Sequence, residues 1–224
     1  MTRILILGGT KEAADLAGRL HAQGHNVITS LAGRTREPRP VAGDVRIGGF
    51  GGTDGLARWL IEHSIERLVD ATHPFALQIS HNAKLASATT GIELELHERP
   101  PWPKCEGDDW HSVPDVDAAV DAIPTDARVL LALGRQHIAP FQRRVDVHFI
   151  VRMIDPPDTP LALASHDIIL ARPSSDWRDE RDLFDRHRVS HILSRNSGGA
   201  GAYAKIEAAR RSGRTVIMIE RPEP

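Results

Sequence analysis

The residues near the start of the chain that are best placed to do chemistry are Gly8, Gly9 and Thr10, which follow the short apolar run 3–7. That run is typical of a strand buried on both faces of a parallel sheet, and apolar residues at helical spacing follow the glycines. Glycines permit a sharp turn close to a ligand, and the N–H groups of a helix N-terminus favour phosphate. The turn therefore indicates phosphate binding. It lacks the full G-x-G-x-x-G pattern, so an ordinary first βα turn remains the alternative.

A second candidate site follows the predicted strand 25–31, where a dinucleotide fold meets the adenosine ribose. An acid at that place holds the 2′-hydroxyl of NAD, whereas a cation accommodates the 2′-phosphate of NADP. The end of this strand supplies Ser30, Gly33 and Arg34, with Arg36 close by, and no acid among them. The presence of arginines and the lack of an acid in this segment favour NADP over NAD. The alternative is a solvated basic loop that binds no cofactor.

Two more loops follow predicted strands of the same sheet. The strand 45–47 runs into a glycine-rich loop that includes Gly51 and Gly52, and Thr53 or Asp54 is expected to cap the next helix.

The other loop holds Thr72 and His73, which follow the predicted strand 67–71. Ligands bind at the carboxyl ends of strands in open α/β sheets, so His73 is a candidate for substrate binding or proton transfer. A lone histidine more often only hydrogen-bonds its surroundings.

The second half of the chain places arginines just after predicted strands, at Arg135, Arg152, Arg172, Arg195 and Arg221. A guanidinium binds carboxylate or phosphate with paired hydrogen bonds, and the carboxyl ends of parallel strands share one edge. We therefore expect an arginine-rich rim that binds a polyanionic ligand. Coding bias explains the number of arginines but not their register with the strands.

A further loop at this edge, Ser197-Gly198-Gly199, is expected to bind anions before a helix that carries Lys205.

Composition narrows the function classes. The 224 residues carry a net charge of −2, with 41% hydrophobic and 26% charged residues, so no global field attracts nucleic acid or an anionic membrane. The apolar runs are far shorter than the ~20 residues of a membrane span. Cys105 is the only cysteine and the histidines lack metal-ligand spacing, so neither a disulfide nor a metal site is expected. A cytoplasmic protein follows as the expectation.

Alternation of predicted strands and helices indicates an α/β protein with two Rossmann-like domains, mainly parallel sheets and a cleft between the domains. Residues 1–99 are expected to bind the dinucleotide, and residues 110–224 are expected to bind the polyanionic ligand. Residues 100–109 contain prolines, have no periodicity and are predicted to form a linker.

Taken together, the motifs resemble the precorrin-6A reductases of cobalamin biosynthesis, from residue 4 to residue 222. The residues that carry the resemblance are Gly8-Gly9-Thr10 with Glu12-Ala13, Gly49-Phe50-Gly51-Gly52, Asp70-Ala71-Thr72-His73-Pro74, Gly134-Arg135, Ala171-Arg172-Pro173, Arg195-Asn196-Ser197-Gly198-Gly199 with Lys205, and Arg221-Pro222. Each motif is weak alone, whereas their order and joint spacing are specific.

The resemblance implies reduction of a macrocycle double bond of precorrin-6A by a nicotinamide hydride, which gives precorrin-6B. It implies that the NADPH pyrophosphate is bound by Gly8, Gly9 and Thr10, that the 2′-phosphate is bound by Ser30, Gly33 and Arg34, and that the nicotinamide is bordered by Gly51, Gly52, Thr72 and His73. Acetate and propionate groups of the tetrapyrrole would be bound by Arg135, Arg172, Arg195, Ser197, Gly198, Gly199 and Lys205. Candidates for the proton source are His73 and Lys205, with water or a substrate group equally open. Transient contact with neighbouring pathway enzymes is also expected.

Two other function classes remain open on the residues alone. One is a cofactor-free, two-domain tetrapyrrole enzyme similar to uroporphyrinogen III synthase. The other is a nucleotide-sensing module without catalysis. A reductase binds NADPH, whereas the cofactor-free enzyme does not. A reductase also converts a tetrapyrrole substrate, whereas the nucleotide-sensing module does not.

Overall fold

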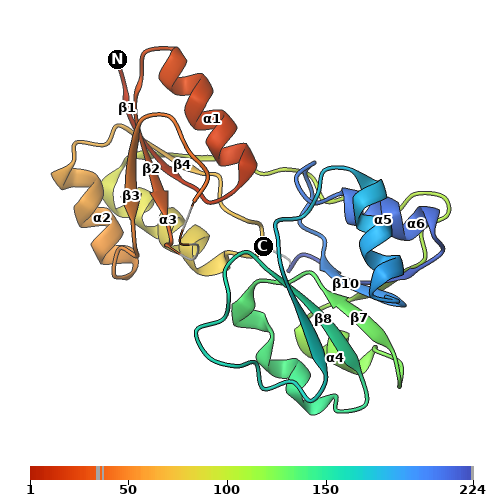
Figure 1. Ribbon diagram of the computed structural model, residues 1–224. Coiled ribbons are helices and arrows are strands. Elements are labelled where there is room, and N and C mark those ends of the chain that lie inside the picture. Colours follow the sequence, from red (N-terminus) through yellow and green to blue (C-terminus); the bar gives the residue numbers. More distant parts are fainter. Residues whose placement is uncertain (34–35, 37, 223–224) are drawn as a thin grey trace. The chain divides into compact units, whose positions relative to one another are not determined.

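The computed structural model describes residues 1–33, 36 and 38–222, so Arg34, a predicted cofactor residue, lies outside the described part. The chain divides into two compact units, Met1–Arg99 and Pro100–Pro224 (Figure 1). Every strand pairing among the described residues is parallel. The predicted α/β class with parallel sheets is therefore confirmed.

The first unit is a sheet of order β3-β2-β1-β4-β5, the strand order of a Rossmann half. Its elements are β1 (Arg3–Leu7), α1 (Lys11–Ala22), β2 (Asn26–Leu31), β3 (Asp44–Ile47), α2 (Gly52–Glu62), β4 (Arg67–Asp70), α3 (Leu77–Thr90) and β5 (Glu93–Leu96). Each element agrees within a few residues with the sequence prediction.

Helices cover both faces of this sheet because β1 alternates its side chains between them. Ile4 and Ile6 pack with α1, whereas Leu5 and Leu7 pack with α2 and α3 on the opposite face (Figure 1). All four side chains are at most 1% exposed. This three-layer packing fixes the strand ends, and with them the loops that leave the sheet.

The second unit is a sheet of order β6-β11-β10-β7-β8-β9. Its elements are β6 (Trp110–Val113), α4 (Val116–Asp121), β7 (Arg128–Leu131), the 3₁₀ turns η1 (Arg135–His137) and η2 (Ala139–Arg143), β8 (His148–Met153), β9 (His166–Leu170), α5 (Trp177–Arg186), β10 (His191–Arg195), α6 (Ala204–Arg211) and β11 (Thr215–Ile219). The sequence patterns predict neither β6 nor α5. Ile150 of β8 packs with α5 and α6, and its neighbour Phe149 stacks edge-on with Phe141 of η2 on the other face.

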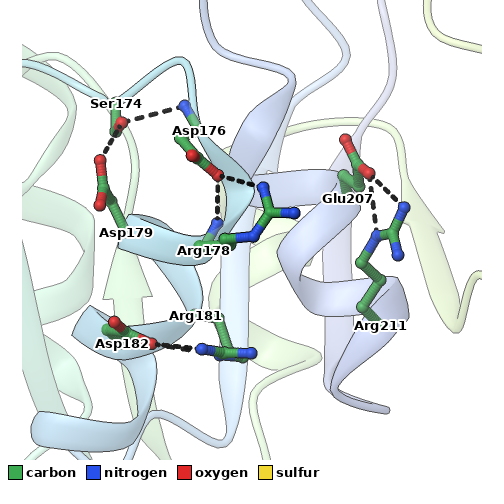
Figure 2. A network of polar contacts seen from close by, with 8 residues as sticks. All are labelled: Ser174, Asp176, Arg178, Asp179, Arg181, Asp182, Glu207 and Arg211. Atoms are coloured by element: carbon green, nitrogen blue, oxygen red, sulfur yellow. Dashed lines mark hydrogen bonds and ion pairs between the residues drawn. The ribbon is translucent and has the colours of Figure 1, made fainter.

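The helix α5 packs on the core through Trp177, Leu183 and Phe184, and polar contacts fix its N-terminus. Asp176 caps its N-terminus, where the carboxylate accepts the Arg178 N–H at 2.8 Å (Figure 2). Ser174 donates to Asp179 at 2.7 Å in the same turn. Phe184 is the one apolar side chain of α5 that is fully buried, which explains why periodicity misses the helix.

Residues 100–109, expected to be a linker, lie within the second unit and are partly built into its core. Trp102 is 6% exposed and packs with Tyr203 at a ring-centroid distance of 5.8 Å. The prolines around Trp102 conceal this role from a reading of periodicity.

Among the described residues, the structure has no helix that is both long enough and apolar enough to cross a bilayer.

Candidate functional site

The candidate cofactor site lies at the carboxyl edge of the first sheet. The strand order reverses between β1 and β4, and open α/β sheets bind ligands at such a switch point. Thr10, after β1, donates its hydroxyl to the carbonyl of Ala71, after β4, at 2.9 Å. The two loops that flank the switch point are thus bonded to each other.

The turn Gly8-Gly9-Thr10 requires its glycines. A Cβ at Gly8 would lie 2.9 Å from Cγ2 of Thr29, and Gly9 has a φ of +107° that side chains rarely adopt. The Thr10 hydroxyl accepts the N–H of Ala13 at 3.0 Å and caps α1. The N–H groups of the first helical turn have no intrahelical partner, so their dipole end faces this turn.

The loop after β4 is held by Asp70, which is 6% exposed. Its Oδ1 accepts the backbone N–H of Thr72 at 3.0 Å and the Thr72 hydroxyl at 2.7 Å. His73 is half-buried, and its Nδ1 accepts the N–H of Phe75 at 3.3 Å. In the neutral ring the proton therefore resides on Nε2. This loop presents a histidine that can donate from a fixed ring.

The end of β2 holds Ser30, which is 7% exposed, and Gly33, whose φ is +73°.

The helix after β3 begins differently from the prediction. Gly51 is the N-cap of α2 with a φ of +81°, no side chain caps the helix, and Thr53 instead donates to Asn82 at 3.2 Å. The prediction that Thr53 or Asp54 caps α2 is wrong, because the chain enters the helix through left-handed glycines.

Glu12 places a carboxylate in the first turn of α1, and Arg99 forms an ion pair with it. The guanidinium neutralises a negative charge that would otherwise repel phosphate from the turn. Glu12 and Arg99 are 87 residues apart in the chain, so no local sequence pattern predicts this pair.

The second unit reverses its strand order between β7 and β10, so the predicted substrate loops also flank a switch point. Arg135 follows β7 and pairs with Asp158 at 3.1 Å, at the rim of an open cavity of about 420 Å³. Arg172 is exposed beyond β9, and Arg195 ends β10. The topology brings these three arginines to one edge of the sheet, as predicted.

Arg152 does not belong to that edge. Its side chain is 5% exposed and forms a bidentate pair with Glu180, with both N···O distances at 2.7 Å. The prediction that Arg152 is part of the rim is wrong, because Arg152 lies inside β8 and the carboxylate comes from α5, the helix that the sequence patterns miss.

Arg221 is tied to the neighbouring loop, since it donates to the carbonyls of Asn196 and Ser197 at 3.0 Å each.

The loop 195–201 is shaped by buried contacts. Gly198 has a φ of +67°, and a Cβ there would lie 2.1 Å from the carbonyl oxygen of Pro100. Asn196 is 4% exposed and accepts the Trp102 N–H at 2.8 Å, while the Trp102 indole donates to the carbonyl of Gly199 at 2.7 Å. Trp102 and Asn196 are 94 residues apart in the chain, so no local sequence pattern indicates this contact. The helix α6 begins at Ala204, so Ser197-Gly198-Gly199 is not its first turn.

Lys205 is 4% exposed, and its ammonium donates to the carbonyl of Ala202 at 2.8 Å. It also lies 4.9 Å from the centroid of the Trp102 ring. The ammonium of Lys205, which the sequence predicts to bind or protonate the substrate, is thus buried against Ala202 and Trp102.

Across residues 1–33, 36 and 38–222, the histidine, cysteine and acidic side chains form no group of three that could hold a metal ion.

Comparisons with known proteins agree with this arrangement. The sequence profile of a family described as precorrin-6x reductase CbiJ/CobK matches residues 3–224. A precorrin-6A reductase of Rhodobacter capsulatus is 45% identical over 99% of this chain and 89% of its own length. The precorrin-6A reductase of Mycobacterium tuberculosis is 40% identical over 99% and 90%, and a cobalt-precorrin-6A reductase of Priestia megaterium is 28% identical over 98% and 91%.

A solved structure described as CobK precorrin-6A reductase superimposes with a TM-score of 0.96 at 45% identity, and covers 100% of this chain and 89% of the solved one. The profile match and the full-length relatives lead to one conclusion: the chain belongs to the precorrin-6x reductase family, CbiJ/CobK.

Proposed function

We propose that this chain reduces one double bond of precorrin-6A with a hydride from NADPH and so produces precorrin-6B. The observation that carries the proposal is the glycine turn at the switch point of the first sheet, combined with membership of a reductase family that implies a nicotinamide cofactor.

The residues at the first sheet edge fit a dinucleotide. Gly8 leaves no room for a side chain and Gly9 exposes backbone at the helix N-terminus, which together form a cradle for pyrophosphate. Ser30 and Gly33 close β2 without an acid, which supports a 2′-phosphate, and Arg34 would add charge there. Gly51, Gly52 and Thr72 would border the nicotinamide. When bound, NADPH supplies the hydride.

The protein's own part is to bind the macrocycle and to deliver a proton. Arg135, Arg172 and Arg195 suit the carboxylates of a tetrapyrrole, and Gly198 and Gly199 would add backbone N–H donors. The N–H of Ser197 already donates to the carbonyl of Arg195 at 2.7 Å, so Ser197 would contribute its hydroxyl instead. His73 is our candidate for the proton source because its Nε2 carries the proton in the neutral ring. Lys205 would have to release the carbonyl of Ala202 to take that role.

The sequence identities to the two groups of relatives support a substrate without cobalt. Relatives named precorrin-6A reductase are 40–46% identical to this chain, whereas those named cobalt-precorrin-6A reductase are 27–28% identical. We therefore propose precorrin-6A without cobalt as the preferred substrate.

An anaerobic spectral assay tests the proposal. Precorrin-6A and cobalt-precorrin-6A are each incubated with the protein and either NADPH or NADH. We expect the fastest loss of precorrin-6A absorbance with NADPH. Binding of NADPH without turnover of either tetrapyrrole would favour a nucleotide sensor, and turnover without any nicotinamide would favour the cofactor-free alternative.

A further inference from the structure

Arg46 of β3 lies beside the end of β2, where the proposed function places the cofactor's 2′-phosphate. In the parallel register of the two strands, Arg46 is the partner of Ser30. Its Nη1 is 3.4 Å from the Ser30 hydroxyl. A guanidinium is therefore already next to the group that marks this subsite.

The loop after β3 fixes the orientation of this guanidinium. Nη1 donates to the carbonyl of Gly48 at 2.5 Å, and Nη2 donates to that of Gly49 at 2.7 Å. The ring of Phe50 lies 3.7 Å below the guanidinium carbon and that of Trp59 lies at 5.7 Å. A planar cation held on two carbonyls and two rings loses little conformational entropy when it binds an anion.

The charge of Arg46 is not neutralised within the described residues, because its partners are carbonyls, a hydroxyl and aromatic rings. Other arginines of the molecule form ion pairs, as Arg99 does with Glu12 and Arg152 with Glu180. Partial burial lowers the pKa of Arg46, and a guanidinium remains protonated at neutral pH nonetheless. Its contacts use three of the five N–H donors, so two remain for a ligand.

We infer that Arg46 is a specificity-determining residue, the fixed cation that binds the 2′-phosphate and makes the chain prefer NADPH over NADH. The inference rests on the proposed NADPH-dependent function. Arg46 was not among the residues predicted from the sequence, because only the register with Ser30 and the carbonyls of the glycine loop reveal its position.

The test compares Arg46→Met and Arg46→Lys with the unmodified protein, by measuring Kd for NADPH, NADH, adenosine 2′,5′-bisphosphate and AMP. Methionine keeps an apolar stem on Phe50 but removes the charge and the donors. We expect Arg46→Met to raise Kd for NADPH and for the bisphosphate by about 10- to 100-fold, as loss of hydrogen bonds to a charged group predicts. Kd for NADH and AMP should change less than about threefold, and Arg46→Lys should be intermediate.

Arg58→Met is the matched control, because it removes an equal charge from an exposed position of α2. It should leave all four dissociation constants nearly unchanged. Equal losses for NADPH and NADH in Arg46→Met would overturn the inference and leave Arg46 as a support of the glycine loop. Unchanged NADPH binding in that variant would overturn it too, with the proposed function intact. If the unmodified protein bound neither nicotinamide, the proposed function itself would fail.

Discussion

At Gly8 the space for a single methyl group decides whether the cofactor turn can form. An added Cβ would lie 2.9 Å from Thr29, whose side chain is fully buried and cannot move aside easily. Gly8→Ala should therefore destabilise the protein by about 1–3 kcal/mol, the usual cost of overpacking. It should also weaken NADPH binding because the turn shifts. Urea unfolding and a fluorescence titration with NADPH measure the two effects.

Gly18→Ala provides the control for that variant. Gly18 lies within α1, has open space within 4 Å of the position that a methyl group would take, and does not have a positive φ. Alanine there should stabilise the protein by about 0.5–1 kcal/mol and leave NADPH affinity unchanged. Stabilisation by Gly8→Ala of similar size would contradict the close packing of the turn against β2.

Single residues were predictable where their role is local. Glycines that must bend the chain leave a signal within a few positions, as Gly9 shows. Helix caps were less predictable, because Thr10 caps α1 without having been predicted to do so and Thr53 does not cap α2. Arg152 and Trp102 could not be placed in this way, since their partners Glu180 and Asn196 are 28 and 94 positions distant. Tertiary pairing, which no local pattern encodes, decides their roles.

At the scale of elements, the Arg152–Glu180 pair joins β8 to α5, and Glu180 also accepts the N–H of Ser174 at 2.9 Å. Both side chains are at most 5% exposed. Glu180→Ala should destabilise the protein by about 3–5 kcal/mol, because it leaves a buried guanidinium without its counter-charge. Urea unfolding followed by tryptophan fluorescence measures the loss.

The double variant Arg152→Met/Glu180→Leu separates charge from packing. Replacement of both members of a buried pair by apolar residues of similar size is often nearly neutral. We expect most of the stability lost in Glu180→Ala to return. A double variant as unstable as the single one would show that the hydrogen bond to Ser174, rather than the buried charge, is the main contribution.

His191, at the start of β10, gives this strand a pH dependence. Burial lowers the pKa of His191 from its usual value of 6.5, while the charge of Asp109 opposes the shift in part. The unfolded chain then binds the proton more readily, so stability is complete above about pH 6.5 and falls as the pH drops below it. His191→Gln should flatten the dependence of Tm on pH between about pH 7 and 5. Parallel Tm curves for the two proteins would contradict this sign.

Elements followed the sequence where hydrophobic periodicity was strong. The buried residues of α1 are Ala13, Leu16, Ala17 and Leu20, as its spacing predicts. The helix α5 was not predicted because it has only three large apolar residues, Trp177, Leu183 and Phe184, and a buried glutamate, Glu180, interrupts their spacing. Charged residues make up most of its exposed surface (Figure 2). The strand β6 was not predicted because its two central residues, His111 and Ser112, are polar and exposed, so it shows neither an apolar run nor alternation.

At the scale of the whole molecule, each unit has a parallel sheet with a switch point and glycine-containing loops at its carboxyl edge. The first sheet supplies the features of a dinucleotide site and the second supplies exposed arginines. We propose that the first unit binds the nicotinamide that supplies the hydride and that the second unit binds the macrocycle.

Isotope transfer tests that claim most directly. The protein is incubated without oxygen in ordinary water with precorrin-6A and NADPH that carries deuterium at both positions of nicotinamide C4, and the product is analysed by mass spectrometry. We predict a product one mass unit heavier than that formed with unlabelled NADPH, since one deuteride is transferred and the proton comes from water or a side chain. A reduced product of the same mass with labelled and unlabelled NADPH would contradict direct hydride transfer.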